Sequence, residues 1–131
     1  MKTIFNALAI ATLVMFSSCA TTAKFPVSDI VPAATISAKK GQDNQKNFTV
    51  KITAKDLASP ERLSPPGNNY SIWIVTKEYG VKNIGQLNVK NANNTTFQTT
   101  TPFDFDEIFI TVEDQGDQQF PEGMVICSTK I

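Results

Sequence analysis

Short runs rich in β-branched and aromatic residues, separated by clusters of turn residues, follow one another along the chain after about residue 32. The clearest run spans residues 48–54, where apolar and polar side chains alternate strictly. This period of two predicts a strand with one buried and one solvated face. The run 70–76 is dense in aromatic and β-branched residues and predicts a central strand. Further strands are expected over residues 33–38, 82–89, 95–100, 107–113 and 124–129.

These seven candidate strands favour an all-β fold over a parallel α/β sheet. The connection 55–69 contains three prolines and a glycine, which exclude a continuous helix, and a single helical turn is expected near 55–58. We therefore predict a single immunoglobulin-like antiparallel β-sandwich of about seven strands. Gly85, inside the run 82–89, indicates a β-bulge or the close approach of a large neighbour such as Trp73.

The N-terminus has the three parts of a secretory signal. Lys2 supplies the positive start, residues 4–16 form an apolar run, and two serines precede Cys19. The segment 16–19 resembles the lipobox of bacterial lipoproteins, with phenylalanine where leucine is usual. There, signal peptidase cuts before the cysteine and its sulfur carries a diacylglycerol. We expect a lipoprotein signal peptide over 1–18 and lipid attachment at Cys19, with an ordinary cleaved signal or a short buried helix as alternatives.

This assignment divides the chain into a signal peptide over 1–18, the lipidated cysteine with its tether over 19–32, and a β-sandwich domain over 33–131. The protein is then expected in the cell envelope, held at the membrane through its lipid. Thr21, where aspartate would favour the inner membrane by enterobacterial analogy, favours the periplasmic face of the outer membrane. If Cys19 is acylated, Cys127 has no disulfide partner, and its apolar neighbours predict a buried, inert thiol.

The composition limits the chemistry that the chain can perform. It contains no histidine, which excludes Ser-His-Asp and Cys-His nucleophiles and any histidine-ligated metal. Lys and Arg number 12 against 12 Asp and Glu, which is atypical of a nucleic-acid-binding domain. No glycine-rich phosphate loop follows any predicted strand. We expect no catalytic residue, no cofactor, no metal site and no nucleic-acid partner.

The charges are unevenly distributed along the chain. Residues 19–100 contain ten basic and five acidic residues, a net +5, whereas 101–131 contain one basic and seven acidic residues, a net −6. Either the acidic strands pair with basic ones across a sheet, or they form an acidic edge that faces a partner. The carboxylates of 103–107 and 113–117 also permit calcium binding or glycoside hydrolysis, although neither stretch has the EF-hand pattern.

Four short motifs in the second half resemble the extracytoplasmic C-terminal domain of anti-sigma-K factors. They are a Tyr-x-x-Trp strand over 70–73, an Ile-Gly-x-Leu return over 84–87, a Val-x-Glu strand end at Glu113, and Pro-x-Gly at 121–123. The resemblance covers about residues 65–127 and implies an immunoglobulin-like sensor or interaction domain. It does not imply direct sigma-factor binding, because that family binds sigma through a cytoplasmic helical domain joined by a transmembrane helix.

The sequence therefore predicts a non-enzymatic, membrane-anchored envelope lipoprotein with an anti-sigma-K-like sandwich that binds an envelope protein or ligand. The first alternative is a small carbohydrate-active or hydrolytic module that uses the C-terminal carboxylates. The second is a purely structural envelope lipoprotein.

Overall fold

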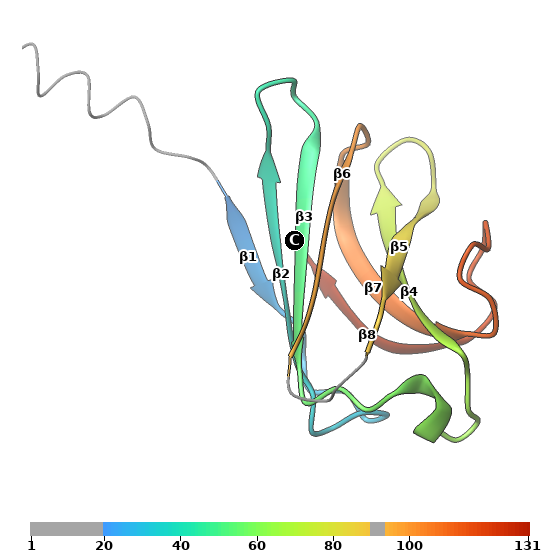
Figure 1. Cartoon of the computed structure of the whole chain (residues 1–131). Helices are drawn as coiled ribbons and strands as arrows, with labels where there is room; N and C mark the ends of the chain where they lie inside the picture. The colour runs from blue at the N-terminus through green and yellow to red at the C-terminus, as the bar shows by residue number, and fades with distance from the viewer. Residues whose placement is uncertain (1–19, 90–93) are drawn as a thin grey trace, which may run out of the picture.

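Two four-stranded antiparallel sheets form the fold in a computed structural model that describes residues 20–89 and 94–131 (Figure 1). Sheet A has the strand order β1-β2-β3-β6, and sheet B has the order β5-β4-β7-β8. The strands are β1 (Thr21–Lys24), β2 (Thr35–Gln42), β3 (Phe48–Lys55), β4 (Asn69–Thr76), β5 (Val81–Leu87), β6 (Thr95–Thr101), β7 (Phe105–Glu113) and β8 (Met124–Lys130). The predicted all-β sandwich is confirmed at this level.

All seven predicted strands are present, with ends that differ by up to four residues. The largest difference is at β2, which continues to Gln42 although its last four residues read as polar. The reason is long-range pairing: β2 pairs with β3 over its whole length, from Thr35 opposite Lys55 to Gln42 opposite Phe48. Asp43 closes this hairpin, because its Oδ1 accepts hydrogen bonds from the backbone N–H groups of residues 45 and 47.

The tether expected over residues 19–32 is wrong from Thr21 onward. Residues Thr21–Lys24 form β1, which pairs along the edge of β2. Phe25 is then buried in the core, and the Ser28 hydroxyl donates a hydrogen bond to the Ile126 carbonyl of β8. Backbone pairing at the sheet edge needs no apolar pattern, so the sequence shows no strand signal there. Cys19 and the predicted signal peptide lie outside the described residues.

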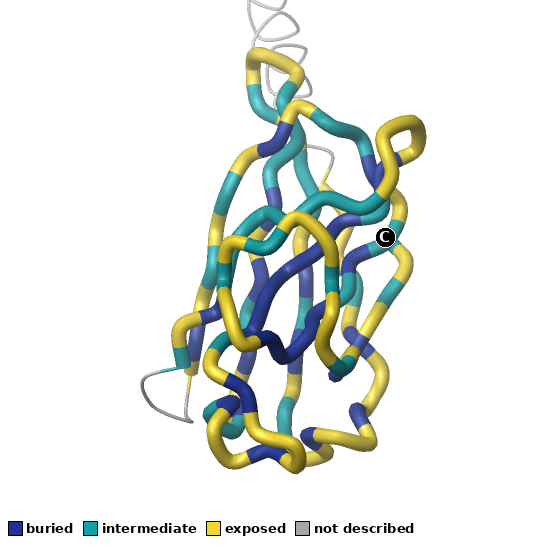
Figure 2. The backbone as a smooth tube through the Cα atoms, turned by 90° about the vertical axis from the view of Figure 1, so that its right-hand side faces the viewer, coloured by how far each residue is buried: buried dark blue, intermediate teal, exposed yellow. Residues whose placement is uncertain are grey.

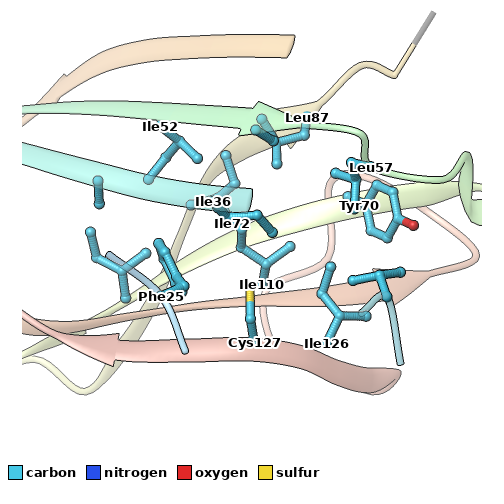
Figure 3. Packing of buried hydrophobic residues seen from close by; sticks show 14 of the residues in the cluster. Phe25, Ile36, Ile52, Leu57, Tyr70, Ile72, Leu87, Ile110, Ile126 and Cys127 are labelled. Atoms are coloured by element: carbon cyan, nitrogen blue, oxygen red, sulfur yellow. The ribbon is translucent and has the colours of Figure 1, made fainter. Parts of the chain in front are cut away.

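The core lies between the two sheets and combines side chains from both (Figure 3). Ile36 and Ile52 come from sheet A, while Ile72, Ile110 and Cys127 come from sheet B. The prediction that Cys127 is buried is confirmed, and burial raises the pKa of its thiol to about 12. A catalytic thiol requires the opposite shift.

The connection between β3 and β4 packs against the core instead of looping out. Leu57 and Leu63 are buried, and the Tyr70 hydroxyl donates a hydrogen bond to the Ala58 carbonyl at 2.6 Å. The helical turn expected near 55–58 is instead a 3₁₀ helix over Pro60–Arg62. Among residues 20–89 and 94–131, no helix has the length and apolar character needed to cross a membrane.

The predicted irregularity at Gly85 is confirmed, but its neighbour is different. The register of β4 with β5 shifts between Ile72 and Trp73, and Gly85 has a φ of 147°. A Cβ atom on Gly85 would lie 2.5 Å from the ring of Phe97, which belongs to β6 of the other sheet. Gly85 pairs with Ile72 on the core side, whereas Trp73 lies on the outer side of sheet B.

Candidate functional site

Strand β4 is buried on both of its faces, which is unusual for an antiparallel sheet with one solvated side. Tyr70, Ile72 and Ile74 belong to the core, and the alternating residues Ser71 and Trp73 therefore point to the outer side of sheet B. Both Ser71 and Trp73 are nevertheless 0% exposed. Something must therefore cover the outer side of sheet B.

A chain of hydrogen bonds connects Trp73 to Glu113 on this outer side. The Trp73 Nε1 donates to Thr111 Oγ1 at 2.8 Å, and the Thr111 hydroxyl donates in turn to Glu113 Oε2 at 2.5 Å. The indole also stacks on the neighbouring ring of Phe109, with ring centroids 6.3 Å apart. Each of the three polar groups is thus hydrogen-bonded although it is buried, as most buried polar groups are.

Glu113 connects this chain to the loop 114–123, which joins β7 to β8. Its Oε1 accepts hydrogen bonds from the backbone N–H of Gly123 at 2.8 Å and of Glu122 at 3.3 Å. The carboxylate is only 2% exposed. A Cβ atom on Gly123 would collide with the Val112 carbonyl oxygen, so only glycine fits there.

The other side of the loop is attached to β5. Asn83 Nδ2 donates to the carbonyl oxygens of Gly116 at 3.1 Å and Gln118 at 3.0 Å, and Gln86 Nε2 also donates to Gly116 O. Asn83 is the pairing partner of Trp73. The loop is therefore fastened on both sides of Trp73, which explains the burial of that residue. In Figure 2, which faces this side, the exposed loop lies in front of buried strand segments.

An open groove of about 940 Å³ lies between this loop and β5 with its preceding turn. Two aromatic residues at its rim are well exposed, Tyr79 at 62% and Phe120 at 70%. Its walls carry several side-chain amides, which can both donate and accept hydrogen bonds. We call it the amide groove, and it is lined by Tyr79, Gly80, Val81, Lys82, Asn83, Gln86, Gly116, Asp117, Gln118, Gln119 and Phe120.

The amide groove is built on a rigid base. The turn before β5 is closed by Thr76, whose backbone N–H and hydroxyl both donate to the Gly80 carbonyl. Tyr79 packs on Phe103 with ring centroids 5.2 Å apart, and Lys82 Nζ lies 5.5 Å from the centroid of the same ring. These contacts hold the Tyr79 side of the rim in place, which lowers the entropic cost of binding there.

Residues from each of the four short motifs noted in the second half of the sequence have a structural role. Trp73 and Glu113 are the ends of the hydrogen-bonded chain, Gly123 accommodates the loop attachment, and Gly85 accommodates Phe97. All four support the sandwich and its loop. The sequence pattern did not indicate the hydrogen-bonded chain between Trp73 and Glu113.

The C-terminal carboxylates do not gather into one site. Asp104 binds two lysines, Lys40 at 2.9 Å and Lys77 at 3.0 Å, and these bonds lower its pKa to about 2. Glu107 pairs with Lys130 at 3.2 Å. Among the described residues that line the amide groove, Asp117 is the single carboxylate. In the part of the chain that the structure describes, no group of three acidic or cysteine residues is placed to hold a metal ion.

Lys40 closes the end of the sandwich beside Asp104. Its Nζ lies 4.4 Å from the centroid of the Phe105 ring and 5.2 Å from that of Phe48, and it also donates to the Phe105 carbonyl. This lysine therefore has a structural role that the charge pattern did not indicate.

Comparisons with protein-family models, with curated proteins and with solved structures find no match.

Proposed function

We propose that the chain is a non-enzymatic lipoprotein of the bacterial cell envelope, anchored by a lipid on Cys19. Its sandwich domain presents the amide groove to an envelope protein or ligand. The observation that supports binding is the loop 114–123, which is fastened to both β5 and β7 and leaves two aromatic rings exposed at the groove rim. Exposed aromatic residues beside amides are typical of recognition surfaces.

The strand order supports an immunoglobulin-like topology within this proposal. The order β2-β3-β6 in sheet A and β5-β4-β7-β8 in sheet B follows the order A-B-E and C′-C-F-G of immunoglobulin-like sandwiches. β1 is an addition at the edge of β2. The anti-sigma-K resemblance is compatible with this topology, and a link to sigma-factor signalling would need another membrane protein to carry it.

Among residues 20–89 and 94–131, the contacts of the carboxylates do not favour the hydrolytic alternative. Glycoside hydrolysis requires two carboxyl groups that face each other across the substrate. Asp104 and Glu107 are paired with lysines, and Glu113 is buried under hydrogen bonds from Thr111 and the loop backbone.

Site-specific photocrosslinking in intact cells tests the binding proposal. A photoreactive residue in place of Phe120, at the groove rim, is expected to give one dominant adduct. The matched control is Val27, which is 77% exposed but does not line the groove. The adduct at Phe120 should be lost when Tyr79→Ala is added. The same adducts at both positions, or none at Phe120, would contradict binding in the amide groove.

The anchor is tested by fractionation. Cys19→Ala should move the protein from the membrane fraction to the soluble fraction, whereas wild-type protein should require detergent for release and resist high salt. Retention of the alanine variant through a high-salt wash would disprove the lipid anchor.

A further inference from the structure

The outer side of sheet A is a flat, polar surface with an unbalanced positive charge. None of its four strands contains an aspartate or glutamate. Core residues such as Ile36, Ile52 and Ala54 fix which side chains face inward, so the alternating positions face outward. These outward positions are occupied by lysine, threonine, serine, glycine and glutamine. We call this surface the lysine face, and its exposed basic residues are Lys24, Lys39, Lys51 and Lys55.

Two of these lysines are directly opposite each other. Lys39 on β2 pairs with Lys51 on β3, and the row continues to Thr22 on β1 and Gln98 on β6. Like charges in directly opposed positions destabilise a sheet. The ion pairs formed among residues 20–89 and 94–131 involve other lysines, so neither Lys39 nor Lys51 is in an ion pair there. The nearest acidic residues flank the face at the β2–β3 hairpin and after β3.

The residue that follows the predicted anchor site in sequence lies beside this face. Ala20, the residue after Cys19, lines a shallow depression together with Lys39, Lys51 and a single acidic residue, Asp43. Only Ala20 separates Cys19 from the start of β1. The two residue steps from Cys19 to Thr21 span at most about 7 Å, which is shorter than the Debye length of about 8 Å at physiological ionic strength. A lipid on Cys19 would therefore hold the start of β1, and with it the row that contains Lys39 and Lys51, near the membrane surface.

We propose that the lysine face lies on the anionic bilayer surface to which Cys19 is anchored, so that lipid and lysines act together as two membrane signals. This inference rests on the lipoprotein proposal. Sheet A and the loop 114–123 lie on opposite sides of the sandwich (Figure 1), so the amide groove faces away from the membrane. The lysine face would contact anionic phosphatidylglycerol headgroups, since a polybasic surface binds anionic lipid through electrostatic attraction.

The chain from Ala20 to Ile131 contains every strand of the sandwich and carries no lipid, which makes it suitable for a vesicle-binding assay. It should sediment with phosphatidylcholine vesicles that contain phosphatidylglycerol, but not with pure phosphatidylcholine, and the binding should weaken as salt rises. Each lysine near the surface is worth about fivefold in affinity, which corresponds to about 1 kcal/mol. The double variant Lys39→Thr/Lys51→Thr should therefore lose about 25-fold.

A matched control removes the same charge from the other parts of the molecule. Lys77→Thr/Lys130→Thr removes two exposed lysines that do not belong to the lysine face. This control should lose less than about threefold, because the two lysines pair with Asp104 and Glu107 and do not belong to the outer side of sheet A. An equal loss in both variants, or equal binding to pure phosphatidylcholine, would overturn the proposal. Threonine is a good strand residue, so Lys39→Thr/Lys51→Thr should melt no lower than wild type.

The two proposals fail in different ways. If the lipid-free chain does not bind anionic vesicles while Cys19→Ala releases the protein from membranes, the membrane-facing orientation is wrong and the lipid anchor is supported. If the lipid-free chain binds the vesicles but wild-type protein washes off cell membranes in high salt without detergent, the lysine face is supported and the lipid anchor is wrong.

Discussion

Replacing Thr111 with valine tests whether the hydrogen-bonded chain from Trp73 to Glu113 holds the loop 114–123 on sheet B. The two side chains have nearly the same shape, so the change removes one hydroxyl and opens no large cavity. That hydroxyl accepts a bond from Trp73 Nε1 at 2.8 Å and donates one to Glu113 Oε2 at 2.5 Å. The variant therefore leaves a buried indole N–H and one buried carboxylate oxygen without their partner.

The expected cost follows from those two groups. A buried polar group left without a partner costs about 1–3 kcal/mol, and more when it is charged. Glu113 keeps its bonds from the loop backbone through Oε1, which limits the penalty on the carboxylate. We expect Thr111→Val to lower the free energy of unfolding by about 2–5 kcal/mol. Since domains are stable by about 5–15 kcal/mol, this is a large fraction of the total.

Ser71→Ala is the matched control for this experiment. Ser71 lies on the same side of sheet B, is 0% exposed, and its hydroxyl has no hydrogen-bond partner. Removing that hydroxyl should be neutral or slightly stabilising. Trp73 is the single tryptophan, so its fluorescence reports both denaturant curves directly. If Thr111→Val costs no more than Ser71→Ala, the chain does not stabilise the loop and the reasoning is wrong.

Four further predictions concern Cys127, Asp104 and Gly85. Burial raises the pKa of the Cys127 thiol from 9.0 to about 12. A thiol reagent near neutral pH should therefore label the native protein roughly a hundredfold or more slower than the unfolded chain. Equal labelling rates would contradict the burial of Cys127. The same raised pKa gives stability that is full below pH 9 and declines as pH rises toward 12, so wild type should lose stability across that window more steeply than Cys127→Ala. The lysine bonds lower the pKa of Asp104 from 3.8 to about 2, so the stability that they give is present above pH 3.8 and disappears as pH falls toward 2. Asp104→Asn should remove this acid dependence of the free energy of unfolding. Because the carboxylate is 39% exposed, the effect should stay below about 1 kcal/mol. Gly85→Ala should lower the melting temperature more than Gly80→Ala. Both glycines have a positive φ, but only Gly85 faces the Phe97 ring. An equal fall in melting temperature for the two variants would show that the contact with the ring is unimportant.

The sequence predicted strands best where one face of the strand is apolar. Residues 48–54 alternate strictly, and β3 lies there with a difference of one residue. β1 could not be found, because an edge strand of four residues is held by backbone pairing with β2 and has no apolar pattern of its own. The position of Trp73 was ambiguous for a related reason. Every residue from 70 to 74 is buried, so alternation could not tell the core face from the covered outer face.

The candidate groove was beyond the reach of the sequence for a different physical reason. The loop 114–123 consists of polar and turn-forming residues, and nothing local indicates that it folds back over β4. Its position depends on side chains far away in sequence, above all Asn83, which binds the Gly116 and Gln118 carbonyls. One signal was available: the Val-x-Glu and Pro-x-Gly motifs contain Glu113 and Gly123, which are in direct contact.

The charge asymmetry along the chain becomes an asymmetry between the two sides of the sandwich. Pairing across strands accounts for only part of it, because the ion pairs within the described residues use Asp104 and Glu107 and leave the acidic groups of the loop 114–123 unpaired. The strands of sheet A contain no acidic residue at all. Near an anionic bilayer such a molecule would be oriented with sheet A toward the lipid and the loop away from it. A long tether would allow the domain to rotate beyond the Debye length, whereas β1 begins two residues after Cys19. The absence of a tether, which the sequence did not predict, is therefore what would turn the charge pattern into a fixed orientation and leave the amide groove open to a partner.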